Sequence, residues 1–421
     1  MSDPGKRKLL SLGAIALVLF LSTCSPGSSQ PAGVDTMSTS ETAPNTLPIP
    51  TITAKPSTPT PTMPAPTSTP TTQPPTLTPT NTLGSLFPAD LPGWIAYTAV
   101  MRPGTSVRID LASMSPDGQN QAWLTDSDID SLIGVFSEDG EQIAYWSFDL
   151  QTQVSNLWVK NIASGGTRPL TTQGVIYMNP VSWSPDGNFI AYEDTYSEDR
   201  ELDIFRIGVY SAELVNLTED SPFRDGSPAW SPDGQWIAFH SNREGEDTAT
   251  EDIWLMSPDG TELQNLTPGT PLWSDRFPAW SPDGSLIAFY RQGDISDAVS
   301  SAALPGLWVM NADGTNQQML VSFDTFANEP PVWSPDSEWI AASDGVPEFS
   351  DIWLVPAQGG EASPILIPGL ERSVCWSPDS RALMLTHDDG EDLYLMLVLL
   401  ELMEVIPIDL EGWGDYCDWT N

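Results

Sequence analysis

The sequence predicts an all-β fold, a β-propeller with seven four-stranded blades. Three observations predict it. A Trp-Ser-Pro-Asp-Gly pentapeptide recurs, its copies begin 43 to 53 residues apart, and short apolar segments follow each copy in a fixed order. A repeat of this length is typical of one four-stranded propeller blade.

The pentapeptides define the repeat. They begin at Trp183, Trp230 and Trp280, with copies ending in Ser at Trp333 and Trp376, and a degenerate copy at Phe136. Proline presets φ in a turn, Asp tolerates the next position, and Gly supplies a left-handed exit. Each copy therefore predicts a tight turn between the first and second strands of a blade.

The segments between the pentapeptides predict the remaining strands. An apolar segment such as Ile190–Tyr192 follows each turn, and a segment with a central aromatic residue, such as Ile253–Leu255, comes next. The fourth strand often ends in Leu-Thr, as in Leu217-Thr218. Short strands separated by polar or Gly-rich connections predict hairpins within each unit.

The two ends of the repeat region complement each other. Residues 93–97 resemble a second strand without its first, and residues 416–421 resemble a first strand with nothing after it. We expect these strands to share one blade, because closing the ring protects their edges. The count is then seven blades, with six as the alternative if one fragment is misassigned.

The first 24 residues have the pattern of a secretion signal. Three basic residues, 6–8, precede the uncharged run 9–23, which is too short to span a bilayer comfortably. The run ends at Cys24 and resembles a bacterial lipoprotein signal, although Thr23 departs from the usual small residue before the cysteine. The resemblance implies lipidation of Cys24 and an extracytoplasmic protein anchored to the membrane or cell surface. An ordinary signal peptide or an uncleaved anchor are the alternatives.

Residues 25–86 are rich in Pro and Thr and poor in apolar residues. Such a segment cannot bury a core, so we expect a disordered, semi-stiff tether. The predicted organisation is therefore a signal peptide at 1–24, a tether at 25–86 and a propeller at 87–421.

The charge restricts the partners. The formal net charge is −41, and all but three of the 57 acidic residues follow residue 86. A surface of this sign repels nucleic acids and anionic headgroups and suits cationic partners. We expect a monomer that contacts the membrane only through its lipid anchor. Solubility, or adaptation to a saline habitat, is the simpler explanation of the charge.

The repeated Trp and Asp residues are predicted to build the fold. Trp residues at this spacing are expected to pack between blades rather than to form a sugar-binding ladder. The turn carboxylates are expected to bond the backbone of their own turns; they belong to Asp186, Asp233, Asp283, Asp336 and Asp379. We therefore assign no catalytic and no cofactor-binding residues.

Two segments are unusually acidic. One contains Glu193, Asp194, Glu198, Asp199, Glu201 and Asp203, and the other contains Glu244, Glu246, Asp247, Glu251 and Asp252. We interpret both as solvated loops, with calcium as the alternative because clustered oxygens suit that ion. His240 and His387 are the only histidines, and no zinc or phosphate-binding motif accompanies them.

Cys375 and Cys417 lie beside the first-strand Trp of the last blade and of the closing blade. A disulfide there would hold the ring closed in an oxidising environment. The register argues against it, because Cys375 is one residue before Trp376 whereas Cys417 is two before Trp419, and successive strand residues point to opposite faces. A disulfide and two buried thiols both remain open.

The pentapeptide repeat resembles the WD40-like, PD40-type repeat of TolB-like propellers, which also occurs in dipeptidyl-peptidase propeller domains. The resemblance covers residues 87–421 and implies a fold rather than one activity. No Gly-x-Ser-x-Gly nucleophile motif is present. We expect a non-catalytic binding or scaffolding module for a surface protein, peptide or glycan. The alternatives are a propeller-type glycan hydrolase or lyase and a TolB-like subunit of an envelope complex.

Overall fold

The structure is a computed structural model. It describes residues 91–101, 108–125, 129–195, 202–219, 221–243, 250–269, 273–293, 305–323, 329–345, 351–365, 370–388, 393–402, 404–408, 410 and 413–421. All of them lie within one compact unit, Pro74–Asn421. In these residues every regular element is a strand, and no helix is long and apolar enough to cross a membrane. The signal-like segment, Cys24 and the tether lie outside the described residues.

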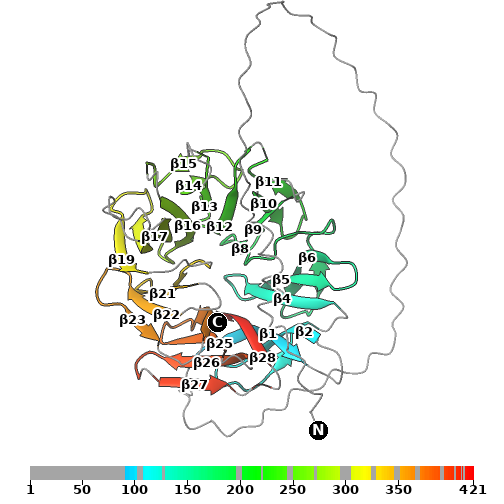
Figure 1. Cartoon of the computed structure of the whole chain (residues 1–421). Helices are drawn as coiled ribbons and strands as arrows, with labels where there is room; N and C mark the ends of the chain where they lie inside the picture. Colours follow the sequence, from blue (N-terminus) through cyan, green and yellow to red (C-terminus); the bar gives the residue numbers. More distant parts are fainter. Residues whose placement is uncertain are drawn as a thin grey trace, which may run out of the picture. The chain divides into compact units, whose positions relative to one another are not determined.

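Seven antiparallel sheets of four strands each form a seven-bladed β-propeller (Figure 1). Blade 1 contains β28 (Trp413–Thr420), β1 (Trp94–Met101), β2 (Arg108–Met114) and β3 (Ala122–Trp123). Blade 2 contains β4 (Asp130–Phe136), β5 (Gln142–Asp149), β6 (Val154–Asn161) and β7 (Thr167–Pro169). Blade 3 contains β8 (Ser182–Trp183), β9 (Phe189–Asp194), β10 (Asp203–Gly208) and β11 (Leu214–Asn216).

The other four blades follow the same order along the chain. Blade 4 contains β12 (Asp225–Trp230), β13 (Ile237–Ser241), β14 (Asp252–Met256) and β15 (Gln264–Asn265). Blade 5 contains β16 (Trp273–Trp280), β17 (Leu286–Gly293), β18 (Gly306–Asn311) and β19 (Gln318–Ser322). Blade 6 contains β20 (Val332–Trp333), β21 (Trp339–Ser343), β22 (Ile352–Pro356) and β23 (Ser363–Ile365), and blade 7 contains β24 (Leu370–Trp376), β25 (Ala382–Asp388), β26 (Leu393–Leu399) and β27 (Glu404–Ile408).

The predicted ring closure is confirmed. The C-terminal strand β28 pairs antiparallel with the N-terminal strand β1, with Trp419 opposite Ile95 and Cys417 opposite Tyr97. Figure 1 shows the red β28 beside the blue β1. Seven blades, rather than the alternative six, are therefore present, and one blade is shared between the two ends of the propeller sequence.

The core is divided into layers between neighbouring blades. Trp376 packs with Leu354 of blade 6, whereas the adjacent residue Cys375 belongs to the cluster that contains Ile95 and Trp419 of blade 1. Successive residues of one strand point to opposite faces of its sheet. Each blade therefore uses one face against the preceding blade and the other face against the next.

A β-bulge interrupts the first strand of several blades. Ile133, Ser227, Phe277 and Tyr416 have positive φ values of 47 to 56°, and the pairing register shifts beside each of them. Each lies three residues before the aromatic residue that begins the turn. A bulge locally redirects the backbone, and at Ile133 and Ser227 it presents the backbone N–H to a side chain of the preceding blade.

The Leu-Thr pairs follow the fourth strands directly and fasten them to the third strands. The hydroxyl of the Thr accepts a backbone N–H from the third strand at 2.9 to 3.0 Å in four blades; the pairs are Leu111 with Thr125, Leu157 with Thr171, Ile204 with Thr218 and Ile253 with Thr267. The Leu-Thr pattern of the sequence thus has a structural role inside these four blades.

Candidate functional site

The repeated turn carboxylates bond within their own turns, as predicted. In the turn at Asp233, Oδ1 accepts the Ser231 hydroxyl at 2.6 Å and the Gln235 N–H at 3.0 Å. The hydroxyl of Ser231, followed by the N–H of Gln235, holds the pKa of Asp233 below its usual value. The same two bonds recur at Asp139, Asp186, Asp283, Asp336 and Asp379. These residues are structural.

The repeated Trp residues pack between blades, which confirms their predicted role. Trp230, Trp333, Trp376 and Trp419 are buried, and Trp183 and Trp280 are partly buried. Three indole N–H groups donate to a backbone carbonyl of the preceding blade at 3.0 Å; the pairs are Trp183 with Val135, Trp333 with Ala279 and Trp376 with Val332. A sugar-binding ladder would require exposed ring faces, which these residues do not offer.

The two acidic segments were predicted to be solvated loops, and this prediction was wrong. Of their residues that the structure describes, only Asp252 is partly exposed and the others are buried. Glu193, Asp194, Asp203 and Glu251 are buried, because they lie at strand ends and bond neighbouring segments. Glu198, Asp199, Glu201, Glu244, Glu246 and Asp247 lie outside the described residues. In the described part of the chain, no group of three or more His, Cys, Asp or Glu residues could hold a metal ion.

One position of the second strand departs from the repeat and defines the candidate site. It directly follows the Ile-Ala-aromatic segment or its equivalent. Its occupants vary in size, polarity and charge; they are Thr98, Trp146, Glu193, His240, Tyr290, Ser343 and Thr386. Most of these side chains reach the next blade. The Thr98 hydroxyl accepts the N–H of Ile133 at 3.2 Å, and the Trp146 indole donates to the carbonyl of Asn179 at 2.8 Å.

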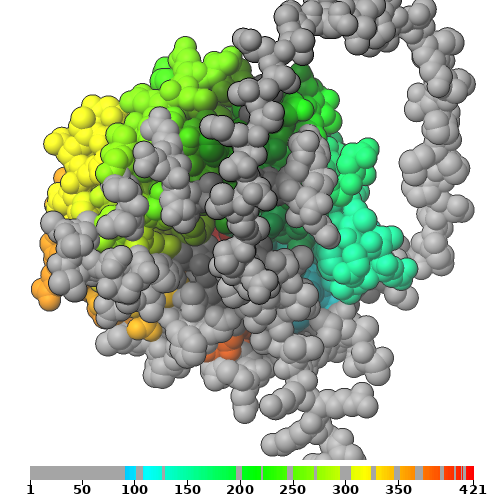
Figure 2. Space-filling model, turned by 45° about the horizontal axis from the view of Figure 1, so that its top comes forward, coloured from blue at the N-terminus to red at the C-terminus, as the bar shows by residue number. Residues whose placement is uncertain are grey.

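Glu193 and His240 supply the carboxylate and the imidazole of this series and lie in adjacent blades. Glu193 Oε2 accepts the N–H of Ser227, the bulge residue of blade 4, at 2.5 Å, and its Oε1 accepts the amide of Asn179. The bulge in blade 4 therefore positions the Glu193 carboxylate. Blades 3 and 4, which carry these residues, are green in the space-filling view of Figure 2.

His240 is buried, with 4% of its surface exposed, and its ring meets Phe277 of blade 5 edge-on at 5.7 Å between centroids. Its Nδ1 has no hydrogen-bond partner among the described residues. Burial, with added repulsion from Arg276 and Arg224, lowers the pKa of His240 well below its usual value. The imidazole is therefore neutral at physiological pH.

The backbone at Gly226 allows Glu193 and His240 to converge. A Cβ at this position would lie 2.8 Å from Glu193 Oε2 and 2.8 Å from His240 Nε2. Arg276, beside Phe277, forms an ion pair with Glu251 and places a positive charge near the imidazole. A carboxylate, a neutral imidazole and an arginine at one place are able to bind a polar ligand or to exchange a proton.

Two other buried carboxylates in these blades are paired with arginine. Arg291 forms a bidentate pair with the fully buried Asp275, at 2.6 and 2.7 Å, and Arg243 bonds Asp225 at 2.7 Å. Both guanidinium groups also lie over aromatic rings, Arg291 over Trp308 and Arg243 over Trp254. Planar guanidinium suits both kinds of contact, so each of these pairs holds together neighbouring strands of its own blade.

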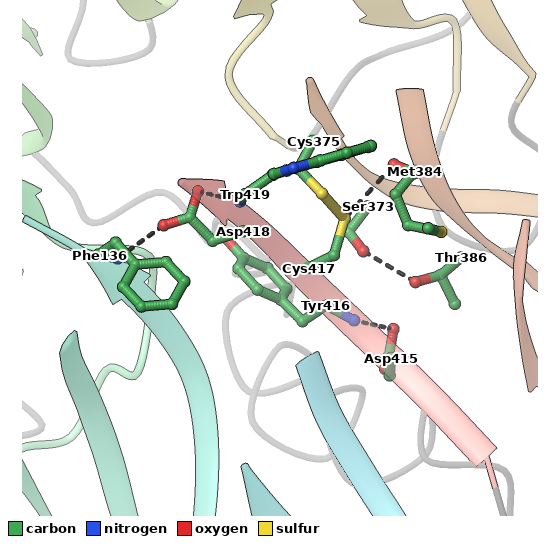
Figure 3. The surroundings of a disulfide bond; sticks show 10 residues. All are labelled: Phe136, Ser373, Cys375, Met384, Thr386, Asp415, Tyr416, Cys417, Asp418 and Trp419. Atoms are coloured by element: carbon green, nitrogen blue, oxygen red, sulfur yellow. Dashed lines mark hydrogen bonds between the residues drawn. A yellow bond between two sulfur atoms is a disulfide. The ribbon is translucent and has the colours of Figure 1, made fainter. Parts of the chain in front are cut away.

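The two cysteines form a disulfide with a Cα–Cα distance of 5.8 Å (Figure 3). The register argument against it was wrong because neighbouring blades meet through opposite faces, which places Cys375 and Cys417 on facing surfaces. The histidines are not brought together, since His240 lies in blade 4 and His387 in blade 7.

The convergence of Glu193 and His240 over Gly226 was not predicted from the sequence. Aligning the residue after each Ile-Ala-aromatic segment would have shown an acid and a histidine at equivalent positions of consecutive repeats. Gly226 did offer a signal, because Gly is depleted in strands and often marks a bulge or a close approach of the backbone. Nothing in the sequence indicated that the N–H of Ser227 would bond Glu193.

The fold and its repeats define the class of protein, a seven-bladed propeller of repeated Ser-Pro-Asp-Gly turns. A family model described as the TolB beta propeller domain matches residues 92–306. The chain belongs to this family, and no curated protein matches it.

Solved structures are similar to this chain, and those with a TM-score above 0.5 share its fold. TolB from Acinetobacter baumannii is 17% identical, with a TM-score of 0.49, 79% of this chain and 68% of that chain being covered. Oligogalacturonate lyase from Vibrio parahaemolyticus is 11% identical, with a TM-score of 0.55 and coverages of 69% and 83%. Prolyl oligopeptidase B from Galerina marginata is 13% identical, with a TM-score of 0.54; 76% of this chain aligns with 51% of the peptidase.

Proposed function

We propose that the chain is an extracytoplasmic, lipid-anchored propeller that serves as a non-catalytic binding or scaffolding module for a surface protein, peptide or glycan. The observation that supports this proposal most is that buried carboxylates are paired with arginine side chains. Asp225, Asp275 and Glu251 are each paired with an arginine. Carboxylates engaged in this way contribute to the rigidity of the blades rather than to chemistry on a substrate.

The charge of the whole chain favours a cationic partner. With a formal net charge of −41, the protein attracts positively charged surfaces and accelerates their association at low ionic strength. We therefore place basic proteins and peptides ahead of neutral glycans as ligands. The similar propellers have different activities, and one fold carries many functions. The ligand therefore has to be identified by experiment.

Binding is tested with the full-length chain in detergent on peptide, protein and glycan arrays. We expect retention of basic ligands, with affinity falling as salt rises from 50 to 500 mM. Salt screens electrostatic attraction and shortens its range. An affinity that does not change with salt concentration would therefore contradict the preference for cationic partners. Retention of no ligand on any array contradicts the binding function itself.

The anchor is tested separately by Cys24→Ala. The wild-type chain should stay with membranes after a high-salt wash, and the variant should be released into the soluble fraction. A variant that stays bound after the wash contradicts lipidation at Cys24.

A second function, a glycan-active enzyme of the propeller type, is favoured by the convergence of Glu193 and His240 over Gly226. A carboxylate beside a neutral imidazole is suited to general acid–base catalysis. Release of shortened or unsaturated glycans by the wild type, lost in Glu193→Gln and His240→Gln but not in Arg381→Ala, would support this function over simple binding.

A further inference from the structure

The closing strand β28 occupies the edge of its sheet and pairs with β1 alone. Two neighbouring side chains fasten its opposite faces to the adjacent blades. Cys417 is bonded to Cys375 of blade 7, and Asp418 Oδ2 accepts the N–H of Phe136 in blade 2 at 2.6 Å. Figure 3 shows both contacts, with the disulfide and the Asp418 carboxylate on different sides of the strand.

The contact of Asp418 has a neutral counterpart elsewhere in the ring. In blade 3, the hydroxyl of Ser182 accepts the N–H of Trp230 at 2.9 Å. No other blade has a carboxylate at the equivalent position. The residues at that position are Val135, Ala229, Ala279, Val332 and the disulfide-bonded Cys375. The closing strand therefore places a carboxylate at a position that a hydroxyl or an apolar group fills elsewhere.

The carboxylate of Asp418 is desolvated by the surrounding protein. Desolvation raises the pKa of Asp418 to about 6, although the N–H groups of Phe136 and Trp419 oppose the change. The pKa of an exposed Asp is about 3.9. The closed strand therefore binds a proton more tightly than the open strand, so closure is favoured at mildly acidic pH and loses stability as the pH rises through about 6.

Other titratable groups surround the closing strand. On β28 itself, Tyr416 lies within electrostatic range of Asp415, Asp418 and Glu329. The strands that contact β28 carry these titratable or charged residues: Tyr97 on β1, Asp130 on β4, Glu371 and Arg372 on β24, His387 and Asp388 on β25, and Tyr394 on β26. Of these residues, His387 is the histidine, and histidine ordinarily changes charge between pH 5 and 8. A variant of His387 therefore serves as the control for a pH effect that does not arise from Asp418.

We propose that β28 is a latch on the ring, which the Cys375–Cys417 disulfide locks and which the protonation of Asp418 tightens. Both cysteines are 5% exposed, so a reductant reaches the disulfide only after the strand has opened. A dithiol then supplies two electrons and two protons: its sulfur atoms form a cyclic disulfide, the Cys375–Cys417 bond breaks, and two thiols are released. Ionisation of Asp418 makes this opening easier.

The test measures the rate at which a dithiol reduces the disulfide in the full-length chain, at pH 5 and at pH 7.5. Each rate is divided by that of the denatured chain at the same pH, which cancels the titration of the dithiol. We expect the protection of the native disulfide to fall about tenfold between pH 5 and pH 7.5, because the open strand loses its proton at a lower pH than the closed strand.

Variants identify the responsible group. Asp418→Asn and Asp418→Ser, the latter copying Ser182, should give the same protection at both pH values, whereas His387→Gln should keep the tenfold change. Equal protection of the wild type at both pH values, or a full pH effect in Asp418→Asn, overturns the proposal.

Hydrogen exchange of the wild type keeps the proposal testable if the variants do not fold. The amides of β28 should lose about tenfold in protection over the same pH interval, with intrinsic rates removed, while those of β13 should not. Parallel losses in both strands would mean global unfolding rather than a latch, and would overturn it.

Discussion

Cys375 and Cys417 are bonded across the joint between the last blade and the strand that closes the ring. One cysteine precedes its blade's Trp by one residue and the other by two, so they lie on opposite faces of their own sheets. Adjacent blades present opposite faces to each other, and the disulfide is possible for that reason.

Removal of the disulfide should weaken the whole ring. For Cys375→Ala/Cys417→Ala we expect the free energy of unfolding to fall by about 2 to 4 kcal/mol, since a cross-link over this separation restricts the unfolded chain. Denaturant unfolding followed by Trp fluorescence measures it. The wild type should also show no titratable thiol from these two residues when denatured without reductant, and two such thiols would contradict the bond.

The pair of Asp275 and Arg291 offers a matched test of buried against exposed charge. Arg291→Met leaves the fully buried carboxylate without its partner, and we expect a loss of about 3 to 5 kcal/mol. Arg381→Met breaks a pair with Asp379 in which the Arg side chain is 45% exposed, and should cost at most about 1 kcal/mol. Equal losses of unfolding free energy in the two variants would show that the buried pair stabilises blade 5 no more than an exposed pair does.

Gly226 should tolerate no side chain. In Gly226→Ala the new methyl group meets Glu193 and His240, and we expect a loss of about 1 to 3 kcal/mol as these groups are displaced. Gly166→Ala is the control, because a Cβ there makes only an ordinary contact with Ser164 at 3.4 Å. Thermal unfolding of both variants measures the effect, and an unchanged Gly226→Ala would remove the basis for the convergence.

The turn carboxylates should make stability depend on acid. The pKa of Asp233 is lowered in the folded state, so its stabilising effect is present above the unfolded pKa of about 4 and disappears as the pH falls through the folded pKa. The stability difference between wild type and Asp233→Asn should therefore shrink from pH 6 to pH 2.5, as measured by denaturant unfolding. A difference that stays constant over this range would contradict the charge-dependent bonding.

The repeat determined most of what the sequence could predict. Ser-Pro-Asp-Gly turns such as Ser231–Gly234 have one favourable conformation, and the fragments at Trp94 and Trp419 complement each other, so the blades and the closure follow from local patterns. The bond between Ser227 and Glu193 and the burial of Glu193 depend on the packing of two blades and carry no local signal. The acidic segment around Glu193 was therefore assigned to solvent.

The central claim is that the propeller binds its ligand without converting it. The most direct measurement incubates the full-length chain with an equimolar amount of a ligand retained on the arrays and analyses the recovered ligand by mass spectrometry. We expect a salt-sensitive complex from which the ligand is recovered intact, with binding unchanged in Arg381→Met. Recovery of cleaved or unsaturated products, lost in Glu193→Gln, would contradict it.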